Sequence, residues 1–327
     1  MKILFVGLGS IGKRHLSNLQ MVANRRNIDI EVILYRSSNV VNNIPYKQIT
    51  DYELALAENP DVVFICNPTH LHLDFAIKAA NKGCHLFIEK PLSHSLEKVD
   101  DLINVTHNKE NIVLVGCNMR FHPGLKLVKK LIDNNTIGDI YSVSASVGQY
   151  LPDWRPNQDY RLSYSAKEEY GGGAILDLIH ELDYVYWLIG DVSEVCALSG
   201  KVSKLEIETE DIAEILLRTK NGIFGHIHLD YLQRDYSRNC KIIGEYGTIL
   251  WDYKEEVVKH FDIRKQNWKV YNISCDRNDM YVEEIEHFFD CIIYGHKPLI
   301  PIEEGKRVLE IAIASKKSSI LKRFIAI

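Results

Sequence analysis

The stretch Lys2-Ile3-Leu4-Phe5-Val6-Gly7-Leu8-Gly9-Ser10-Ile11-Gly12 decides the fold of the first third of the chain. Its apolar first half predicts a buried strand, and the sequence from Ser10 to about Ala23 predicts a helix. A Gly-x-Gly-x-x-Gly turn between a strand and a helix is typical of a dinucleotide site. Gly7 would permit the tight turn, Gly9 would let the Ser10-Ile11 backbone approach a pyrophosphate, and Gly12 would allow close helix packing. The alternative is an ordinary strand-to-helix turn that merely uses glycine.

Strand-like and helix-like segments alternate after this turn. The alternation predicts a parallel sheet, and the continuous apolar character of its strands suits a sheet covered on both faces. Thr50 with Glu53 indicates a capping box, and Gly83 is typical of a helix end. The predicted strands cover residues 30–35, 61–66, 85–88 and 112–117, and the predicted helices cover residues 51–57, 70–82 and 95–107.

The end of the second strand predicts which dinucleotide is bound. It reads Tyr35-Arg36-Ser37-Ser38 and has no carboxylate to hold an adenosine ribose. A guanidinium and hydroxyl groups can instead bind a 2′-phosphate. The sequence therefore predicts NADP in preference to NAD, with Arg36 and Ser37 as ligands. A solvated Arg36 that binds nothing is the alternative.

Two further segments carry groups suited to chemistry. Glu89-Lys90-Pro91 follows a strand, so Lys90 should emerge at the carboxyl edge of the sheet, where ligands bind; a solvated lysine is the alternative. A glycine-bounded helix over residues 171–190 places Asp177 and His180 three residues apart on one face. A carboxylate beside an imidazole can orient a general acid/base, although a solvated, salt-bridging face would look the same.

Taken in order, these motifs resemble the glucose-fructose oxidoreductase/inositol dehydrogenase (Gfo/Idh/MocA) family over about the first 190 residues. The resemblance includes Cys66-Asn67-Pro68 with His70, and Met119-Arg120-Phe121 with Pro123. It implies a Rossmann domain followed by an open, mainly antiparallel sheet domain, an α/β plus α+β chain. It also implies cofactor contacts from Asn67, Pro68, His70, Glu89 and Lys90, and sugars, inositols or nucleotide sugars as substrates.

The resemblance implies that Lys90 and His180 surround the reacting hydroxyl, with Asp177 as a third catalytic group. Family members usually place the aspartate four residues before the histidine, whereas Asp177 precedes His180 by three. The two spacings point side chains in different directions, so Asp183 or Glu181 could take the orienting role instead.

The composition changes at about His122, which divides the chain into a dinucleotide domain, residues 1–121, and a substrate and oligomerisation domain, residues 122–327. Asn221-Gly222 and Tyr246-Gly247 predict hairpins in the second domain. The strand-like runs lie near residues 193–200, 210–219, 222–232, 238–244, 247–253 and 256–263, and a closing helix is predicted over 303–323. The resemblance implies a homodimer or homotetramer through the second sheet.

A loop over residues 149–161 combines aromatic rings, arginines and amides just before the glycine-bounded helix. Trp154 and Tyr160 can stack on a ring, and Arg155 can bind a carboxylate or phosphate. We expect these residues, with Arg120 and His180, to contact substrate; a surface loop or dimer contact is the alternative. The loop and the helix together look like a family branch associated with nonulosonic, sialic-acid-like sugars.

Composition excludes several other classes. The chain has 39 lysines and arginines against 44 aspartates and glutamates, a net charge of −5, which argues against nucleic-acid and acidic-membrane binding. No apolar run approaches the ~20 residues of a membrane helix, and seven scattered cysteines suit a reducing cytoplasm. The His-x-His pairs at residues 70–72 and 226–228 lack a third ligand at metal-site spacing, so no metal is expected.

The sequence thus predicts an NADP(H)-dependent oxidoreductase that moves a hydride between nicotinamide and a secondary alcohol or ketone of a sugar. Two alternatives stay open. One is a non-catalytic dinucleotide-binding sensor, and the other is a reductase of a non-sugar carbonyl or imine.

Overall fold

The computed structural model describes residues 1–38 and 44–327, which form two compact units. The first unit contains residues 1–118 and 281–307, and the second contains residues 119–280 and 308–327. The first crossing lies close to the predicted boundary at residue 121. Residues 281–307, predicted within the second domain, instead belong to the first unit, because Phe288 packs against Phe64 and Phe87 of its sheet.

The first unit is built on a six-stranded parallel sheet, as predicted. The strand order β3-β2-β1-β4-β5-β6 places β1 beside both β2 and β4, so successive connections leave β1 in opposite directions. Ligands of such sheets bind at this switch point, outside the carboxyl ends of the strands. The strands are β1 (Lys2–Val6), β2 (Glu31–Tyr35), β3 (Lys47–Ile49), β4 (Val62–Ile65), β5 (His85–Glu89) and β6 (Val113–Gly116).

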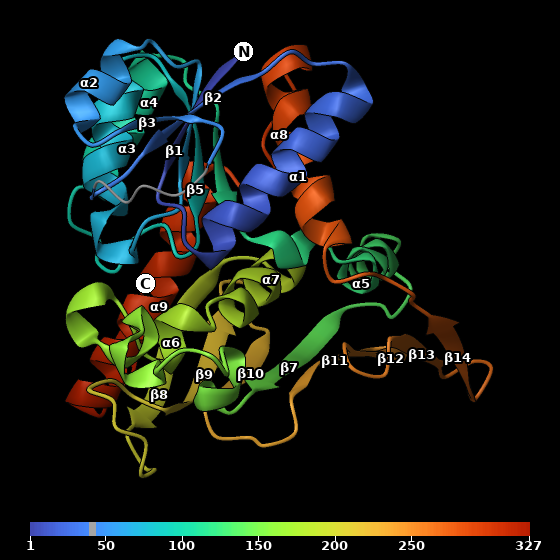
Figure 1. Ribbon diagram of the computed structural model, residues 1–327. Helices are drawn as coiled ribbons and strands as arrows, with labels where there is room; N and C mark the ends of the chain where they lie inside the picture. The colour runs from blue at the N-terminus through green and yellow to red at the C-terminus, as the bar shows by residue number, and fades with distance from the viewer. Residues whose placement is uncertain (39–43) are drawn as a thin grey trace. The chain divides into compact units, whose positions relative to one another are not determined.

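Helices cover both faces of this sheet, which explains why its strands are apolar throughout. Figure 1 shows α2 to α4 on one face and α1 with α8 on the other. Between them, Phe64 stacks on Phe5 and Phe87 with ring centroids 4.7 and 4.8 Å apart. The helices are α1 (Ser10–Arg26), α2 (Tyr52–Ala57), α3 (His72–Asn81), α4 (Val99–Asn108) and α8 (Asp279–Tyr294).

Several local predictions for the first unit were wrong. The helix predicted from residue 70 begins at His72, after a 3₁₀ turn, η1 (Thr69–Leu71), and the helix predicted from residue 95 begins at Val99. Asp51, not Thr50, caps α2, because its carboxylate accepts a 3.0 Å hydrogen bond from Leu54 N. Strand β3 and helix α8 were not predicted.

The second unit contains a nine-stranded sheet in the order β14-β13-β12-β11-β7-β10-β9-β8-β15. All neighbouring pairs are antiparallel except β7 with β10, which confirms the predicted open, mainly antiparallel sheet. The two predicted hairpins join β9 to β10 and β11 to β12, whereas β14 and β15 were not predicted. The strands are β7 (Ile140–Gly148), β8 (Val192–Gly200), β9 (Ile212–Thr219), β10 (Phe224–Asp230), β11 (Ser237–Gly244), β12 (Gly247–Asp252), β13 (Val257–Asp262), β14 (Asn267–Asn272) and β15 (Ile325–Ala326).

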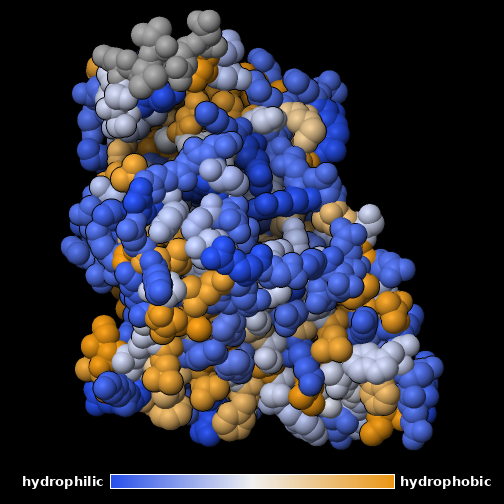
Figure 2. Space-filling view, turned by 60° about the horizontal axis from the view of Figure 1, so that its bottom comes forward, coloured by the Kyte–Doolittle hydropathy of each residue, from blue (hydrophilic) through white to orange (hydrophobic). Residues whose placement is uncertain are grey.

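One face of the second sheet packs against helices and the other is open. Along β9, Ala213, Ile215 and Leu217 are buried, while Leu216 and Arg218 between and beyond them are exposed. Figure 2 shows apolar patches among hydrophilic side chains across the lower part of its view. The helices are α5 (Pro123–Asp133), α6 (Ala174–Asp177), α7 (His180–Ile189) and the end of α9 (Ile302–Leu321), and short 3₁₀ turns include η2 (Asn118–Phe121), η3 (Leu151–Trp154) and η5 (Tyr164–Ala166).

Candidate functional site: a dinucleotide half-site and a polar cluster

The glycine turn after β1 is packed as a dinucleotide turn requires. Gly7 has a φ of +92°, and a Cβ at this position would lie 2.7 Å from Asn67 N. A Cβ at Gly12 would lie 2.3 Å from the carbonyl oxygen of Gly7. Both contacts involve backbone atoms that have little freedom to move, so only glycine fits at these two positions.

Gly9 differs, because a Cβ there would meet no described atom within 4 Å. Gly9 is the N-cap residue of α1, whose first turn, including Ser10 and Ile11, has no acidic residue. Free N–H groups at such a helix end suit a phosphate. The side-chain amide of neighbouring Asn67 is buried and has no hydrogen-bond partner among the described residues. These features fit a bound dinucleotide.

Gly9 and Gly12 therefore give a matched pair of variants, one at an open position and one at a closely packed position. Gly9→Ala is expected to keep its unfolding midpoint and lose dinucleotide affinity, because its methyl group would occupy the open side of the turn. Gly12→Ala is expected to be destabilised by about 1–3 kcal/mol from overpacking. Thermal unfolding and dinucleotide titration check this pair; equal stability loss in both variants would contradict it.

The remaining predicted cofactor residues lie at or beside the carboxyl edge of the same sheet. Arg36 and Ser37 follow β2, where Arg36 N donates to Ile49 O at 2.9 Å. Pro68 is exposed and precedes η1, and the ring of His70 lies 6.4 Å from that of His94. The first unit thus brings the residues following β1, β2 and β4 to one sheet edge.

Glu89 has a structural partner that the sequence analysis missed. Its carboxylate lies 2.5 Å from Nε2 of His15, a completely buried residue of α1. This contact ties β5 to the helix that follows the glycine turn, so Glu89 supports the cofactor turn through α1. Lys90, the next residue, is half-buried where β5 ends.

His72 is the second residue that sequence reasoning did not place in the site. Its Nε2 lies 2.9 Å from Asn67 O and its Nδ1 lies 3.0 Å from Pro91 O. Burial lowers the pKa of this imidazole. His72 therefore joins the loops that follow β4 and β5, and so holds Asn67 near the Lys90 loop. The His-x-His motif at residues 70–72 drew attention to this histidine, but the sequence did not show which of the two side chains points inward.

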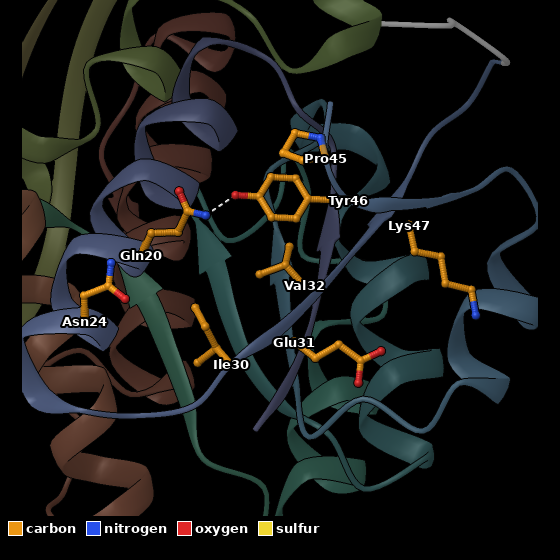
Figure 3. A pocket seen from close by; sticks show the side chains of 8 residues that line it. All are labelled: Gln20, Asn24, Ile30, Glu31, Val32, Pro45, Tyr46 and Lys47. Atoms are coloured by element: carbon orange, nitrogen blue, oxygen red, sulfur yellow. Dashed lines mark hydrogen bonds between the residues drawn. The ribbon is translucent and has the colours of Figure 1, made fainter. Parts of the chain in front are cut away.

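A cavity of about 450 Å³ in the first unit lies elsewhere. It is formed by the last turns of α1, the start of β2 and the segment leading into β3. The Gln20 side chain donates a hydrogen bond to Tyr46 Oη across it (Figure 3). The glycine turn and Arg36 lie at the other end of these strands. This cavity is therefore separate from the dinucleotide half-site.

In the second unit, the continuous helix predicted within residues 171–190 is broken. Helix α6 ends at Asp177, Leu178 leaves helical geometry with a ψ of 29°, and α7 begins at His180. The Asp177 carboxylate accepts hydrogen bonds from Tyr164 Oη and Ser165 Oγ, both at 2.6 Å, and from Tyr231 Oη at 3.3 Å. These hydroxyls hold Asp177 at the point where the predicted helix is interrupted.

The two alternative orienting carboxylates bind arginines. Glu181 is completely buried and lies 2.8 Å from Arg238 Nε. Asp183 accepts from Nε and Nη2 of Arg120 at 3.0 and 2.8 Å. His180 itself is 9% exposed at the start of α7. Glu181 and Asp183 thus each pair with an arginine, and an orienting role toward His180 stays a prediction.

Arg120 requires a correction. It was predicted to contact substrate, but it is 0% exposed and makes a bidentate ion pair with Asp183. Its Cζ lies 5.8 Å from the centroid of the Trp187 ring. Its motif residues fold into η2, which turns the guanidinium into the interior. This burial and the pairing with Asp183 argue against a direct contact between Arg120 and substrate.

The predicted substrate loop is ordered by its own contacts. Trp154 Nε1 donates to Gln149 O at 3.1 Å, and its ring meets Tyr231 edge-on with centroids 5.3 Å apart. The Arg155 guanidinium lies 5.7 Å from the Tyr164 ring. Tyr160 Oη accepts from Glu206 N at 3.2 Å. The second unit thus gathers Trp154 and Arg155 around the residues that hold Asp177.

No set of three or more metal-binding side chains occurs within residues 1–38 and 44–327. His228 lies between Asp230 and Glu214, and these hydrogen bonds raise its pKa to about 9. A protonated imidazole is not a metal ligand. In the described part of the chain, no helix has the length and apolarity needed to cross a bilayer.

Two family models match the chain. Residues 1–117 match the oxidoreductase family, NAD-binding Rossmann fold, and residues 125–250 match the GFO/IDH/MocA C-terminal domain. The chain therefore belongs to the Gfo/Idh/MocA family and is an oxidoreductase with an NAD-binding Rossmann domain.

Individual relatives agree with this assignment. The chain is 30% identical to myo-inositol 2-dehydrogenase of Thermotoga maritima over 345 aligned positions, covering 99% of this chain and 97% of that one. It is 33% identical to 2,7-anhydro-N-acetylneuraminate hydratase of Mediterraneibacter gnavus, over 44% of this chain and 37% of that one. A solved complex of levoglucosan dehydrogenase with NADH and levoglucosan has the same fold, with a TM-score of 0.89, 20% identity and coverage of 100% and 99%.

Proposed function

We propose that this chain oxidises a secondary alcohol of a sugar or cyclic polyol, or reduces the matching ketone, with NADP(H) as cofactor. The observation that carries this proposal is the pair of half-sites: a glycine turn with Lys90 nearby in the first unit, and His180 with the Trp154 loop in the second. Relatives named for inositol and levoglucosan dehydrogenases support the substrate class.

The proposed mechanism assigns separate tasks to the two residues. A bound nicotinamide would supply or accept the hydride. Lys90 Nζ would donate a hydrogen bond to the reacting oxygen, which favours charge developing there. The His180 imidazole would take the hydroxyl proton during oxidation and return it during reduction.

Substrate turnover tests the function directly. Dinucleotide reduction should appear with at least one member of a panel containing myo-inositol, levoglucosan, acidic nine-carbon sugars and nucleotide sugars. The last two classes are included because of the anhydro-N-acetylneuraminate relative and the sequence of the loop. Turnover only with non-sugar carbonyls or imines would replace the proposed substrate class, and binding without any turnover would favour a sensor.

The proposed preference for NADP depends on Arg36. We expect NADP to bind about tenfold or more tightly than NAD, because a guanidinium bonded to a 2′-phosphate adds a charge-assisted contact. Arg36→Ala should weaken NADP binding and leave NAD binding unchanged. Fluorescence titration of both dinucleotides checks this, and a preference for NAD in the unaltered protein would refute it. The NADH complex of the structural relative makes this test necessary.

We also propose that a second copy of the chain covers the open face of the second sheet. Exposed apolar side chains on this face include Leu198, Leu216 and Phe224, which are 71%, 52% and 57% exposed. The same face carries Arg218 and Glu214, so it has charges of both signs and can complement itself.

Mass measurement in solution tests this association. The unaltered protein should be a dimer or tetramer, and Leu198→Glu with Phe224→Glu should shift it toward monomer, because buried carboxylates are costly. Leu54→Glu, an equally exposed leucine in the first unit, is the control. An unaltered protein that is monomeric would overturn the proposal. We further propose a cytoplasmic location, because the seven cysteines form no disulfide within the described residues.

A further inference from the structure

Tyr231, which directly follows β10, contacts both Asp177 and Trp154. The sequence alone did not single out this tyrosine. Its Oη donates to Asp177 Oδ2 at 3.3 Å, and its ring meets Trp154 at an interplanar angle of 86°. Its carbonyl oxygen also accepts from Leu151 N at 3.0 Å. One completely buried side chain therefore joins the end of the sheet, the loop and the carboxylate.

The loop is held at its other end by the same carboxylate. Tyr164 and Ser165 of η5 donate to the two oxygens of Asp177, and Ser165 O accepts from Thr209 Oγ1 at 3.1 Å. Asp177 therefore fixes the end of the segment that begins at Gln149. Tyr231 is the residue that connects this anchor to Trp154 in the middle of the segment.

Tyr231 has a fixed protonation state. Burial, and then the charge of Asp177, raise the pKa of its phenol well above the ordinary tyrosine value. The phenol therefore stays protonated and donates. Its carboxylate partner accepts three hydroxyl donors, an arrangement suited to holding a loop in place.

We propose that Tyr231 is a positioning residue for substrate binding, which fixes the Trp154 and Arg155 loop against Asp177 before substrate arrives. This inference depends on the proposed function, in which that loop contacts the sugar. Without Tyr231, the Trp154 ring would lose its contact with this anchor, and part of the loop would be ordered only on binding. Ordering flexible side chains at that step reduces affinity and leaves the chemical step intact.

Two substitutions separate the contacts of Tyr231. Tyr231→Leu removes the ring contact and the hydrogen bond, and we expect the KM for the sugar to rise about tenfold, with kcat within about threefold of the unaltered value. Tyr231→Phe keeps the ring and should give an intermediate KM. The KM for the dinucleotide should not change. Tyr246→Phe and Tyr246→Leu, at an exposed turn of the same unit, are the controls.

A kcat that falls with KM unchanged would overturn the proposal, because Tyr231 would then act in the chemical step. A dinucleotide KM that rises in parallel would also overturn it, by showing a general defect. If Tyr231→Leu does not fold, Tyr231→Phe and Ser165→Ala still test the link, since each removes one donor to Asp177 Oδ2.

Limited trypsin digestion separates failure of this inference from failure of the proposed function. Cleavage after Arg161, within the loop, needs no substrate and should be faster in Tyr231→Leu than in the unaltered protein. Faster cleavage without any sugar turnover would keep the loop anchor and refute the function. Unchanged cleavage with unchanged KM would refute the anchor and leave the function standing.

Discussion

Replacement of His180 by alanine is expected to lower kcat by about 10²–10⁴-fold, the usual contribution of a positioned general acid/base. Lys90→Ala is expected to lower it by about 10²–10³-fold, because the reacting oxygen loses a preorganised donor. Dinucleotide affinity should be retained in the His180 variant, since the glycine turn and Asn67 belong to the first unit.

Steady-state kinetics on the sugar found by the substrate panel, together with dinucleotide titration, measure these effects. Lys109→Ala and His296→Ala remove an exposed lysine and an exposed histidine of the first unit and serve as matched controls. Wild-type rates in both the Lys90 and the His180 variants would show that the proposed mechanism is wrong.

Removal of either partner of the Arg120–Asp183 pair is expected to destabilise the second unit by about 3–5 kcal/mol. Both side chains are completely buried, so Arg120→Ala or Asp183→Ala leaves a charged group in the interior without its bidentate partner. A double replacement, Arg120→Met with Asp183→Leu, should be much less destabilising than either single change, because it removes both charges of the pair.

Denaturant unfolding followed by tryptophan fluorescence suits this measurement. All four tryptophans, at positions 154, 187, 251 and 268, lie in the second unit, so the signal reports on that unit alone. Single variants as stable as the unaltered protein would contradict the expectation. Loss of sugar binding with stability retained would restore the substrate role first predicted for Arg120.

The parts of the fold that sequence predicts are those set by local pattern. The strand, glycine turn and helix at the start of the chain follow from apolar runs and from steric needs that only glycine meets, as the backbone contacts of Gly7 and Gly12 show. Helix α8 was missed, although its apolar residues have helical spacing. Its place on the first sheet depends on a contact between Phe288 and Phe64 that is distant in sequence.

The sequence predicted which residue types form the candidate site better than it predicted the hydrogen-bond and ion-pair partners of those residues. The spacing of Asp177 and His180 predicts one helical face, but hydroxyls from Tyr164, Ser165 and Tyr231 hold the aspartate where α6 ends. These donors are 13, 12 and 54 residues away in sequence, respectively, so periodicity carries no information about them. The same holds for Arg120, whose partner is 63 residues away.

The path of the chain between the two units also limits how they can be separated. The chain passes between the units three times, because residues 281–307 return to the first unit before residues 308–327 complete the second with β15. A fragment ended at residue 121 would lack α8 and leave the aromatic face of Phe64 and Phe87 uncovered. An independently folding nucleotide module would need the early and late segments joined by a new linker.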